Sequence, residues 1–279
     1  MLNTQIVGNA MQMAVCTLRP GQVLYAEAGK FLFRSGDVGM ETRFQQPLSQ
    51  KGASGKAGMK GLMQGALEAG KRMLAGESFA FQQFQTSGGD GLVALAGVLP
   101  GEVRTIEVVP GDVWLTEKDA FVGAEGSVRF DIEFSGFGRG LGGGEGFVLE
   151  RFTSELGGTL IIGGAGNFID VNPADYGGKL FVDTGCIVAF EGTKIRYGVQ
   201  MIGGFNRQGL ASAMFGREGL TQATLEGDGR VILQSMTIGA LASALAKNQA
   251  SSGRGEDGPS MTGGLGMGAL GSLLGGGRD

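Results

Sequence analysis

Two blocks of sequence recur in the same order three times along this 279-residue chain. Each first block has a glycine turn, an apolar run that ends at an acidic residue, a second apolar run and another glycine turn. Each second block passes through a glycine-containing turn into a final apolar run. The first blocks begin at Pro20, Pro110 and Tyr176, and the second blocks at Gly76, Gly144 and Arg217. The order of the blocks predicts three copies of one unit, each too long for a solenoid coil.

The apolar runs are typical of short β-strands. Residues 127–134 alternate polar and apolar side chains throughout, which is the period of a half-buried antiparallel strand. The 56 glycines make up about a fifth of the chain, whereas the usual share is about 7%. They lie between such runs. There is no Gly-X-Y period and there are only six prolines, so a collagen fold is excluded.

These observations predict an all-β fold of three tandem β-sandwich units, similar to double-stranded β-helices, with pseudo-threefold symmetry. We place the units at 1–104, 105–172 and 173–246, with an insertion at 45–75 in the first. Residues 238–246 are expected to form a short closing helix. Residues 247–279 are a Gly/Ser/Met-rich tail that is predicted to be disordered.

The composition excludes much of catalytic chemistry. The chain contains no histidine, which removes Ser-His-Asp and Cys-His catalysis and the commonest metal ligand. A formal GxGxxG occurs at Gly138, Gly140 and Gly143, but the segment after it reads as strand, turn and strand instead of a helix. We therefore expect a hairpin loop there, and predict no enzyme activity, no cofactor and no metal site. Chemistry by the 27 acidic residues alone remains open.

Charge and hydropathy bear on partners and compartment. A net charge of −4 counts against nucleic-acid binding, which depends on neutralising phosphates. No stretch approaches 18 uninterrupted apolar residues, and the start of the sequence resembles neither a secretory signal nor an arginine-rich mitochondrial leader. We therefore predict a cytoplasmic protein, in which Cys16 and Cys186 are free thiols.

The insertion at 45–75 is the candidate interaction segment. It combines a Gly/Ser/Lys-rich first half with methionines and leucines at helical spacing in its second half. One interpretation is a basic amphipathic helix that contacts anionic lipid or a partner groove, and the other is a helix that packs on a neighbouring unit. The basic residues of this segment are Lys51, Lys56, Lys60, Lys71 and Arg72.

One acidic residue recurs at the same point of the three first blocks. These residues are Glu27, Glu117 and Asp183, and the following strands pass through Phe31, Phe121 and Ile187. The acids are either a triplicated ligand site or carboxylates that accept turn N–H groups. We favour the structural role, because no basic or metal-ligating residue recurs beside them.

Several of these segments carry a family resemblance. PGQVLYAEAGKFLF from Pro20, GESF at 76–79 after Lys71-Arg72, PGEVRTIEV at 100–108 and LFVDTGCIVAFE at 180–191 resemble the altered-inheritance-of-mitochondria family, linked to mitochondrial biogenesis. The resemblance covers residues 1–240. It implies a fold similar to the tryptophan RNA-binding attenuation protein and a homotrimer that closes into a pseudo-ninefold ring. The family has no established reaction, so it implies no catalytic residues.

Three functions follow as hypotheses. The first is a non-catalytic scaffold or interaction protein that forms a trimeric ring and contacts other proteins or a membrane surface. The second is a ring that binds RNA or a small ligand, by analogy of fold alone. The third is a hydrolase or isomerase that uses carboxylates, which ranks last because no pocket is visible in a sequence.

Overall fold

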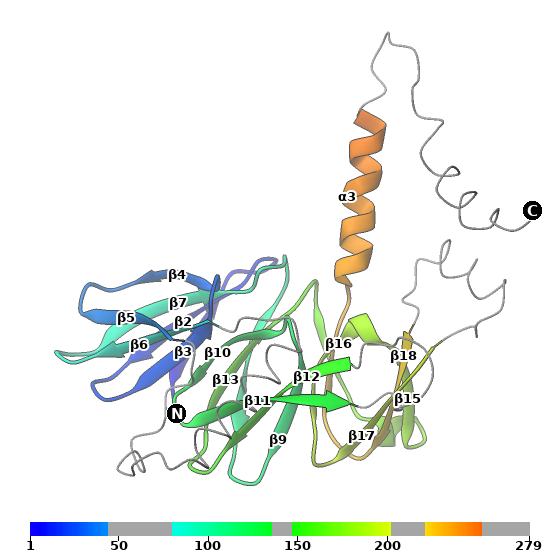
Figure 1. Ribbon diagram of the computed structural model, residues 1–279, viewed down its shortest axis with the longest axis horizontal. Coiled ribbons are helices and arrows are strands. Elements are labelled where there is room, and N and C mark those ends of the chain that lie inside the picture. The colour runs from blue at the N-terminus through cyan, green and yellow to red at the C-terminus, as the bar shows by residue number, and fades with distance from the viewer. Residues whose placement is uncertain (44–79, 136–146, 202–220, 253–279) are drawn as a thin grey trace, which may run out of the picture. The chain divides into compact units, whose positions relative to one another are not determined.

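The computed structural model describes residues 1–43, 80–135, 147–201 and 221–252. They form nineteen strands, two 3-10 helices and one α-helix (Figure 1). The strands of the first half are β1 Asn3–Val7, β2 Met13–Leu18, β3 Val23–Glu27, β4 Phe31–Arg34, β5 Val38–Arg43, β6 Phe81–Thr86, β7 Gly91–Ala96, β8 Val103–Val108, β9 Val113–Glu117, β10 Phe121–Glu125 and β11 Val128–Ser135. The remaining elements are β12 Phe147–Ser154, β13 Gly158–Gly163, β14 Phe168–Val171, η1 Pro173–Tyr176, β15 Lys179–Asp183, η2 Thr184–Cys186, β16 Ile187–Glu191, β17 Ile195–Met201, β18 Thr221–Gly227, β19 Val231–Gln234 and α3 Ile238–Ser252. This content confirms the predicted all-β class.

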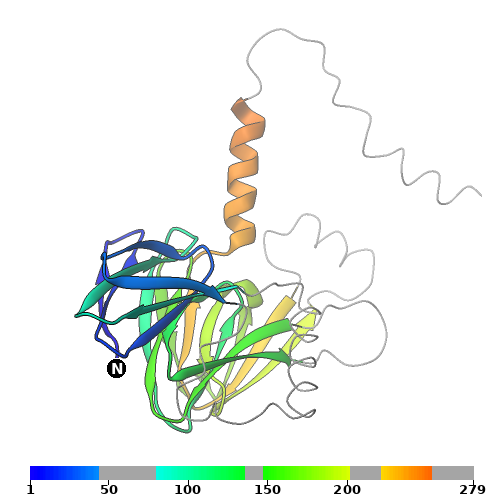
Figure 2. The same cartoon turned by 60° about the vertical axis from the view of Figure 1, so that its left-hand side comes forward.

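The strands pair antiparallel in four sheets (Figures 1 and 2). Their orders are β1-β2-β7-β4, β5-β6-β3-β10-β13-β8, β11-β12-β9-β16-β19-β14 and β15-β18-β17. Within β2–β7, strand β7 lies between β2 and β4, and β6 lies between β5 and β3. The same pairings hold in β8–β13 and in β14–β19, and we call these three sets the first, second and third strand groups.

Two strand pairs join successive strand groups. Strand β3 of the first group pairs with β10 of the second, with Ala26 opposite Gly123. Strand β9 of the second group pairs with β16 of the third, with Thr116 opposite Ala189. Both six-stranded sheets therefore contain strands from two groups, and main-chain hydrogen bonds continue across each junction.

Proline and glycine form the turns that precede strands β3 and β9. In the turns before them, the Gln22 N–H donates to the Arg19 carbonyl at 3.0 Å, and the Asp112 N–H donates to the Val109 carbonyl at 3.1 Å. Between these residues stand Pro20-Gly21 and Pro110-Gly111, and both glycines have φ near +90°. Proline fixes the first corner of such a turn and glycine adopts the positive φ of the second, so both turns follow from the dipeptide.

One cluster of the hydrophobic core combines residues from different strand groups. Phe121 is fully buried, and its ring centroid lies 5.0 to 6.0 Å from those of Tyr25, Phe130 and Phe152. The same cluster includes residues from all three groups, among them Phe81, Trp114, Leu160, Val188 and Ile232. Strand β11 contributes Val128, Phe130 and Ile132 to it, which confirms the alternation predicted at 127–134.

The helix at the end of the described residues begins at Ile238, as predicted, and continues to Ser252. By its contacts the chain divides into Met1–Ala240 and Leu241–Asp279. The predicted unit boundaries at 104 and 172 remain predictions. The insertion at 45–75 and the tail beyond Ser252 lie outside the described residues. No helix in the described ranges is long and apolar enough to cross a membrane.

We expect Phe121→Ala to lower the free energy of unfolding by about 3–5 kcal/mol, because it removes a large side chain from a closely packed aromatic cluster. Urea unfolding followed by circular dichroism measures the change. Leu156→Ala is the matched control, since Leu156 is 75% exposed and its truncation is expected to change stability by less than about 0.5 kcal/mol. Equal losses in the two variants would contradict this assignment of the core.

Candidate functional site

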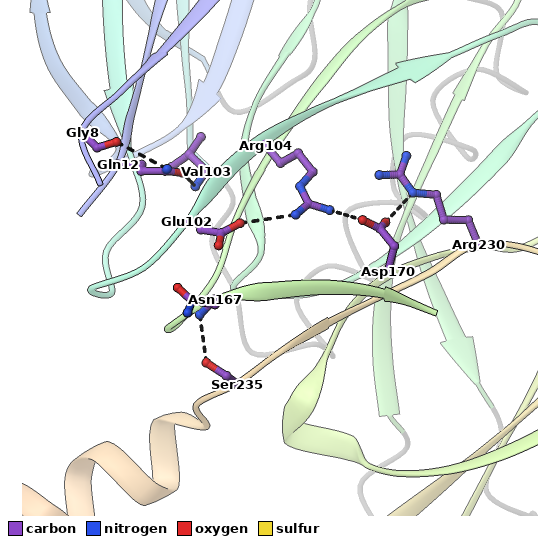
Figure 3. A network of polar contacts seen from close by, with 9 residues as sticks. All are labelled: Gly8, Gln12, Glu102, Val103, Arg104, Asn167, Asp170, Arg230 and Ser235. Atoms are coloured by element: carbon purple, nitrogen blue, oxygen red, sulfur yellow. Dashed lines mark hydrogen bonds and ion pairs between the residues drawn. The ribbon is translucent and has the colours of Figure 1, made fainter. Parts of the chain in front are cut away.

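The segments just before β2, β8 and β14 meet at one place (Figure 3). The Gln12 N–H donates to the Gly101 carbonyl at 3.0 Å, and the Gln12 Oε1 accepts the Val103 N–H at 2.9 Å. The Glu102 N–H in turn donates to the Gly166 carbonyl at 3.1 Å. One chain segment from each strand group is thus joined to the next by backbone and amide hydrogen bonds.

Glycine is required where these segments touch. A Cβ atom on Gly101 would lie 2.1 Å from the Gly164 carbonyl oxygen and 2.6 Å from the Gly166 nitrogen, both backbone atoms. Gly166 itself has φ of +74°, a conformation that L side chains rarely adopt. The segments before β8 and β14 therefore approach more closely than any other residue type permits.

A chain of ion pairs continues from this junction. Arg104 on β8 donates to Glu102 at 3.3 Å and to Asp170 on β14 at 2.6 Å, and Asp170 also accepts from the Arg230 Nε at 2.6 Å (Figure 3). The guanidinium groups also cover aromatic rings, Arg104 over Phe168 and Arg230 over Trp114. Asp170 therefore joins Arg104 of the second strand group to Arg230 of its own third group.

The pKa of Asp170 is lowered from its ordinary value. Partial burial alone raises this pKa, but the hydrogen bonds and positive charges of Arg230 and Arg104 outweigh burial. Asp170 is thus held in its charged form.

An open cleft of about 520 Å³ adjoins the ion pairs on the third strand group. Its lining residues come from the end of β14, helix η1, the β16–β17 turn and the β18–β19 turn: Asp170, Val171, Asn172, Asp175, Glu191, Lys194, Asp228, Gly229 and Arg230. Four of these side chains are acidic and two are basic, so the formal charge of the lining is −2. The cleft therefore favours cations and N–H donors over anions.

Hydrogen bonds fix the side chains of the cleft. Glu191 accepts the backbone N–H of Arg230 at 2.7 Å on Oε2 and the Lys194 Nζ at 2.8 Å on Oε1. Asn172 donates to Asp228 at 2.8 Å and accepts the Gly229 N–H at 3.1 Å. The hydrogen bond and the charge of Glu191 raise the pKa of Lys194, so Lys194 stays protonated.

Metal-ligating side chains and thiols are the other groups of the described residues that bear on chemistry. No group of three or more acidic or cysteine side chains there is placed to hold a metal ion. Cys16 and Cys186 are free thiols, as predicted, and burial raises the pKa of Cys16 to about 11. Burial, with the charge of Asp183, also raises the pKa of Cys186, so neither thiol is activated as a nucleophile.

The structure separates the predicted site residues into two sets. The basic residues of the insertion, Lys51, Lys56, Lys60, Lys71 and Arg72, lie outside the described residues. The recurring acids have structural contacts: Glu117 accepts the Asp119 N–H and Asp183 accepts the Gly185 N–H, both at 2.9 Å, while Glu27 pairs with Lys30 at 3.2 Å. The turn-capping role that we favoured is what Glu117 and Asp183 perform.

The sequence analysis missed Asp170, Glu191 and Arg230. Glu102 and Arg104 lie in the PGEVRTIEV segment, which was quoted above only because it resembles the family. The available signal for Glu191 was that an acid recurs at the end of two corresponding strands, Glu125 in β10 and Glu191 in β16. Their partners are set by strand register, which the sequence alone does not give.

We expect Gly101→Ala to destabilise the protein by about 1–3 kcal/mol, because the new Cβ meets backbone atoms that cannot move aside. Thermal and urea unfolding measure the change. Gly88→Ala is the matched control, since nothing lies within 4 Å of a Cβ there. A Gly101→Ala variant as stable as this control would show that the close approach is absent.

We expect Asp170→Asn to lower stability at pH 7 and to have progressively less effect as the pH falls. The folded-state pKa of Asp170 is depressed, so its ionised form contributes stability above the unfolded-state pKa of about 3.9. That contribution is lost as the pH falls through the folded-state value. Urea unfolding of the wild type and the variant between pH 7 and pH 2.5 tests this, and a difference independent of pH would contradict it.

Comparison with known proteins gives a consistent result. Residues 4–236 match the family described as mitochondrial biogenesis AIM24. An uncharacterized protein of Streptococcus pyogenes serotype M6 is 27% identical over 230 residues, which are 82% of this chain and 84% of that protein. The crystal structure of a Streptococcus pyogenes protein matches the fold with a TM-score of 0.64 at 22% identity, covering 89% of this chain and all of the other. The chain belongs to the AIM24 mitochondrial biogenesis family.

Proposed function

We propose that this protein is a non-catalytic scaffold that assembles head to tail into a homotrimeric ring, with three copies of one six-strand unit in each chain. The observation that carries the proposal is a pair of strand edges that have no partner strand within the described residues. Strands β10 and β16 each pair with the preceding group, whereas the corresponding strand β4 is the last strand of its sheet. Strands β3 and β9 each pair with the following group, whereas β15 is likewise an edge strand. The two edges are complementary in position.

The two edges also carry exposed apolar side chains. Leu32 and Phe33 on β4 are 48% and 49% exposed, and Phe181 on β15 is 56% exposed. An unpaired strand with exposed apolar residues is a template for pairing with another chain. Association of β4 with β15 of the next chain would cover these side chains and satisfy the main-chain groups of both strands.

The pairs inside the chain give the register expected between chains. Ala124 lies opposite Tyr25, and Phe190 lies opposite Leu115. Strands β4, β10 and β16 pair with β7, β13 and β19, respectively. Arg34, Ala124 and Phe190 hold the same register position in these three pairings, so Arg34 is the counterpart of the other two residues. Arg34 is therefore expected opposite Phe181 of the next chain, because β15 pairs with β18 as β3 pairs with β6.

A head-to-tail contact closes into a ring when its rotation divides a full turn, and otherwise extends into a filament. The resemblance to the attenuation-protein fold supplies the number of three chains.

The inactivated thiols and the absence of histidine support a role without catalysis. The acidic lining of the cleft counts against the alternative of an RNA-binding ring.

The basic insertion is proposed as the contact of this scaffold with a protein partner or an anionic membrane surface, in the cytoplasm. Its support is the charge of Lys51, Lys56, Lys60, Lys71 and Arg72, with one acid between residues 45 and 75. Removing residues 51–72 is expected to abolish association with anionic liposomes or a captured partner.

Gly36 gives a sharp test of the ring. A Cβ on Gly126 would lie 2.8 Å from the Val23 side chain across the junction, and one on Gly192 would lie 2.9 Å from Leu115. A Cβ on Gly36, at the corresponding turn after β4, would have no atom of the described residues of its own chain within 4 Å. We expect Gly36→Leu to fold normally and to lose assembly, because the side chain would meet the β15 of the next chain.

Light scattering of the wild type should give three times 28.7 kDa. The Gly36→Leu variant should give one chain mass, with an unchanged circular dichroism spectrum. Gly88→Leu adds the same side chain at another open turn and should remain a trimer. A monomeric wild type, or a trimeric Gly36→Leu variant, would refute pairing of β4 with β15.

A further inference from the structure

The start of the chain fills a site between the first and second strand groups. The Leu2 N–H donates to the Glu125 Oε2 at 3.0 Å and to the Thr159 Oγ1 at 3.2 Å. The Leu2 side chain is 6% exposed and belongs to the core cluster of the first group. From Asn3 onward the segment continues as β1, paired along the outer edge of β2. An extended segment is thus held by one carboxylate, one apolar pocket and one strand edge.

The cleft on the third strand group is lined by Glu191, which is the counterpart of Glu125. Glu125 follows Ala124, which pairs with Leu160, and Glu191 follows Phe190, which pairs with Val231. The Glu125 Oε2 accepts the N–H of Thr159, just before Leu160, at 3.2 Å. In the same way, the Glu191 Oε2 accepts the N–H of Arg230, just before Val231, at 2.7 Å. The two carboxylates therefore hold the same place in the strand register.

The two sites differ in what occupies them. The Glu125 Oε2 accepts two backbone N–H groups, from Thr159 and from Leu2. The Glu191 Oε2 accepts one, from Arg230, and it borders the open cleft of about 520 Å³. Glu191 is 14% exposed and Glu125 is 13% exposed, so the carboxylates are similarly buried. Glu191 has the geometry to accept a second N–H from a bound backbone.

A strand edge is joined to the cleft by the ion pair of Arg104 on β8 with Asp170 of the lining. Strand β1 covers the edge of β2, and the corresponding strand of the second group is β8. In the described residues β8 is the last strand of its sheet and pairs only with β13, although its first N–H group, that of Val103, already donates to Gln12. The acidic lining adds a charge preference that the first site lacks, with Asp170, Asp175 and Asp228 around Glu191.

We infer that the cleft and the β8 edge bind an extended, basic peptide segment of a partner protein. Its backbone N–H bonds the Glu191 Oε2, and its basic side chains face Asp170, Asp175 and Asp228 of the cleft lining. The following residues add to β8 as β1 adds to β2, a mode in which main-chain hydrogen bonds supply affinity. Both sites lie within one chain, so the inference does not depend on ring assembly.

The probe is a fluorescein-labelled heptapeptide with the sequence of residues 1–7, lysine in its first position and blocked ends. Anisotropy on titration with the full chain measures binding. Trp114 is the one tryptophan of the chain and lies opposite Glu191 and under Arg230, so an unlabelled peptide should also change its emission. We expect saturable binding, with an N-methyl group on the peptide's leucine nitrogen weakening it about tenfold by removing the N–H.

Glu191→Gln should weaken binding about tenfold, because a charge-assisted hydrogen bond is replaced by a neutral one. Glu226→Gln is the matched control: it removes the same charge from β18, where Glu226 pairs with Lys179 and Arg196 outside the cleft. This variant should bind as the wild type does. No saturable binding up to about 1 mM, or equal binding by the N-methylated peptide or by Glu191→Gln, would overturn the inference.

Discussion

The structure depends on main-chain pairing between strand groups that lie far apart in sequence. Strand β10 pairs with β3 and β16 pairs with β9, and each junction brings a glycine against the neighbouring strand. At both junctions the glycine N–H donates across the boundary at 2.7 Å, Gly126 to the Val23 carbonyl and Gly192 to the Val113 carbonyl. Because these bonds join backbone to backbone, they fix the register between the groups.

A side-chain oxygen closes each strand group at the same point. Ser35 follows β4, whereas Glu125 and Glu191 are the last residues of β10 and β16. These three side chains accept the backbone N–H groups of Leu92, Thr159 and Arg230, respectively. Where this oxygen belongs to a carboxylate, it has capacity for a further donor, which is Leu2 at Glu125. The hydroxyl of Ser35 lacks that charge. The three positions thus share a structural role and differ in the ligands they can take.

Much of the fold could be predicted from the sequence, because its signals are local. Alternation gave β11, Pro-Gly gave the turns before β3 and β9, and small helix-forming residues gave the start of α3. The sequence pattern also aligned Phe31, Phe121 and Ile187, which in the structure pair with Leu95, Ile162 and Leu233, each followed by a register shift. The site was not predictable in this way. Arg104 and Arg230 are 126 positions apart in the sequence. They meet at Asp170 only through the register of the sheets.

The sharing of sheets between strand groups has a consequence for synthesis. When β3 leaves the ribosome, its partner β10 has not been made, because Ala26 pairs with Gly123 almost a hundred residues later. At about 5–20 residues per second, the edge of β3 stays open for roughly 5–20 s. The edge of β9 waits in the same way for β16. During that interval the nascent chain exposes an apolar strand edge to other nascent chains. Fast translation, or a chaperone bound to these two strands, therefore favours the correct fold over pairing of strands between chains.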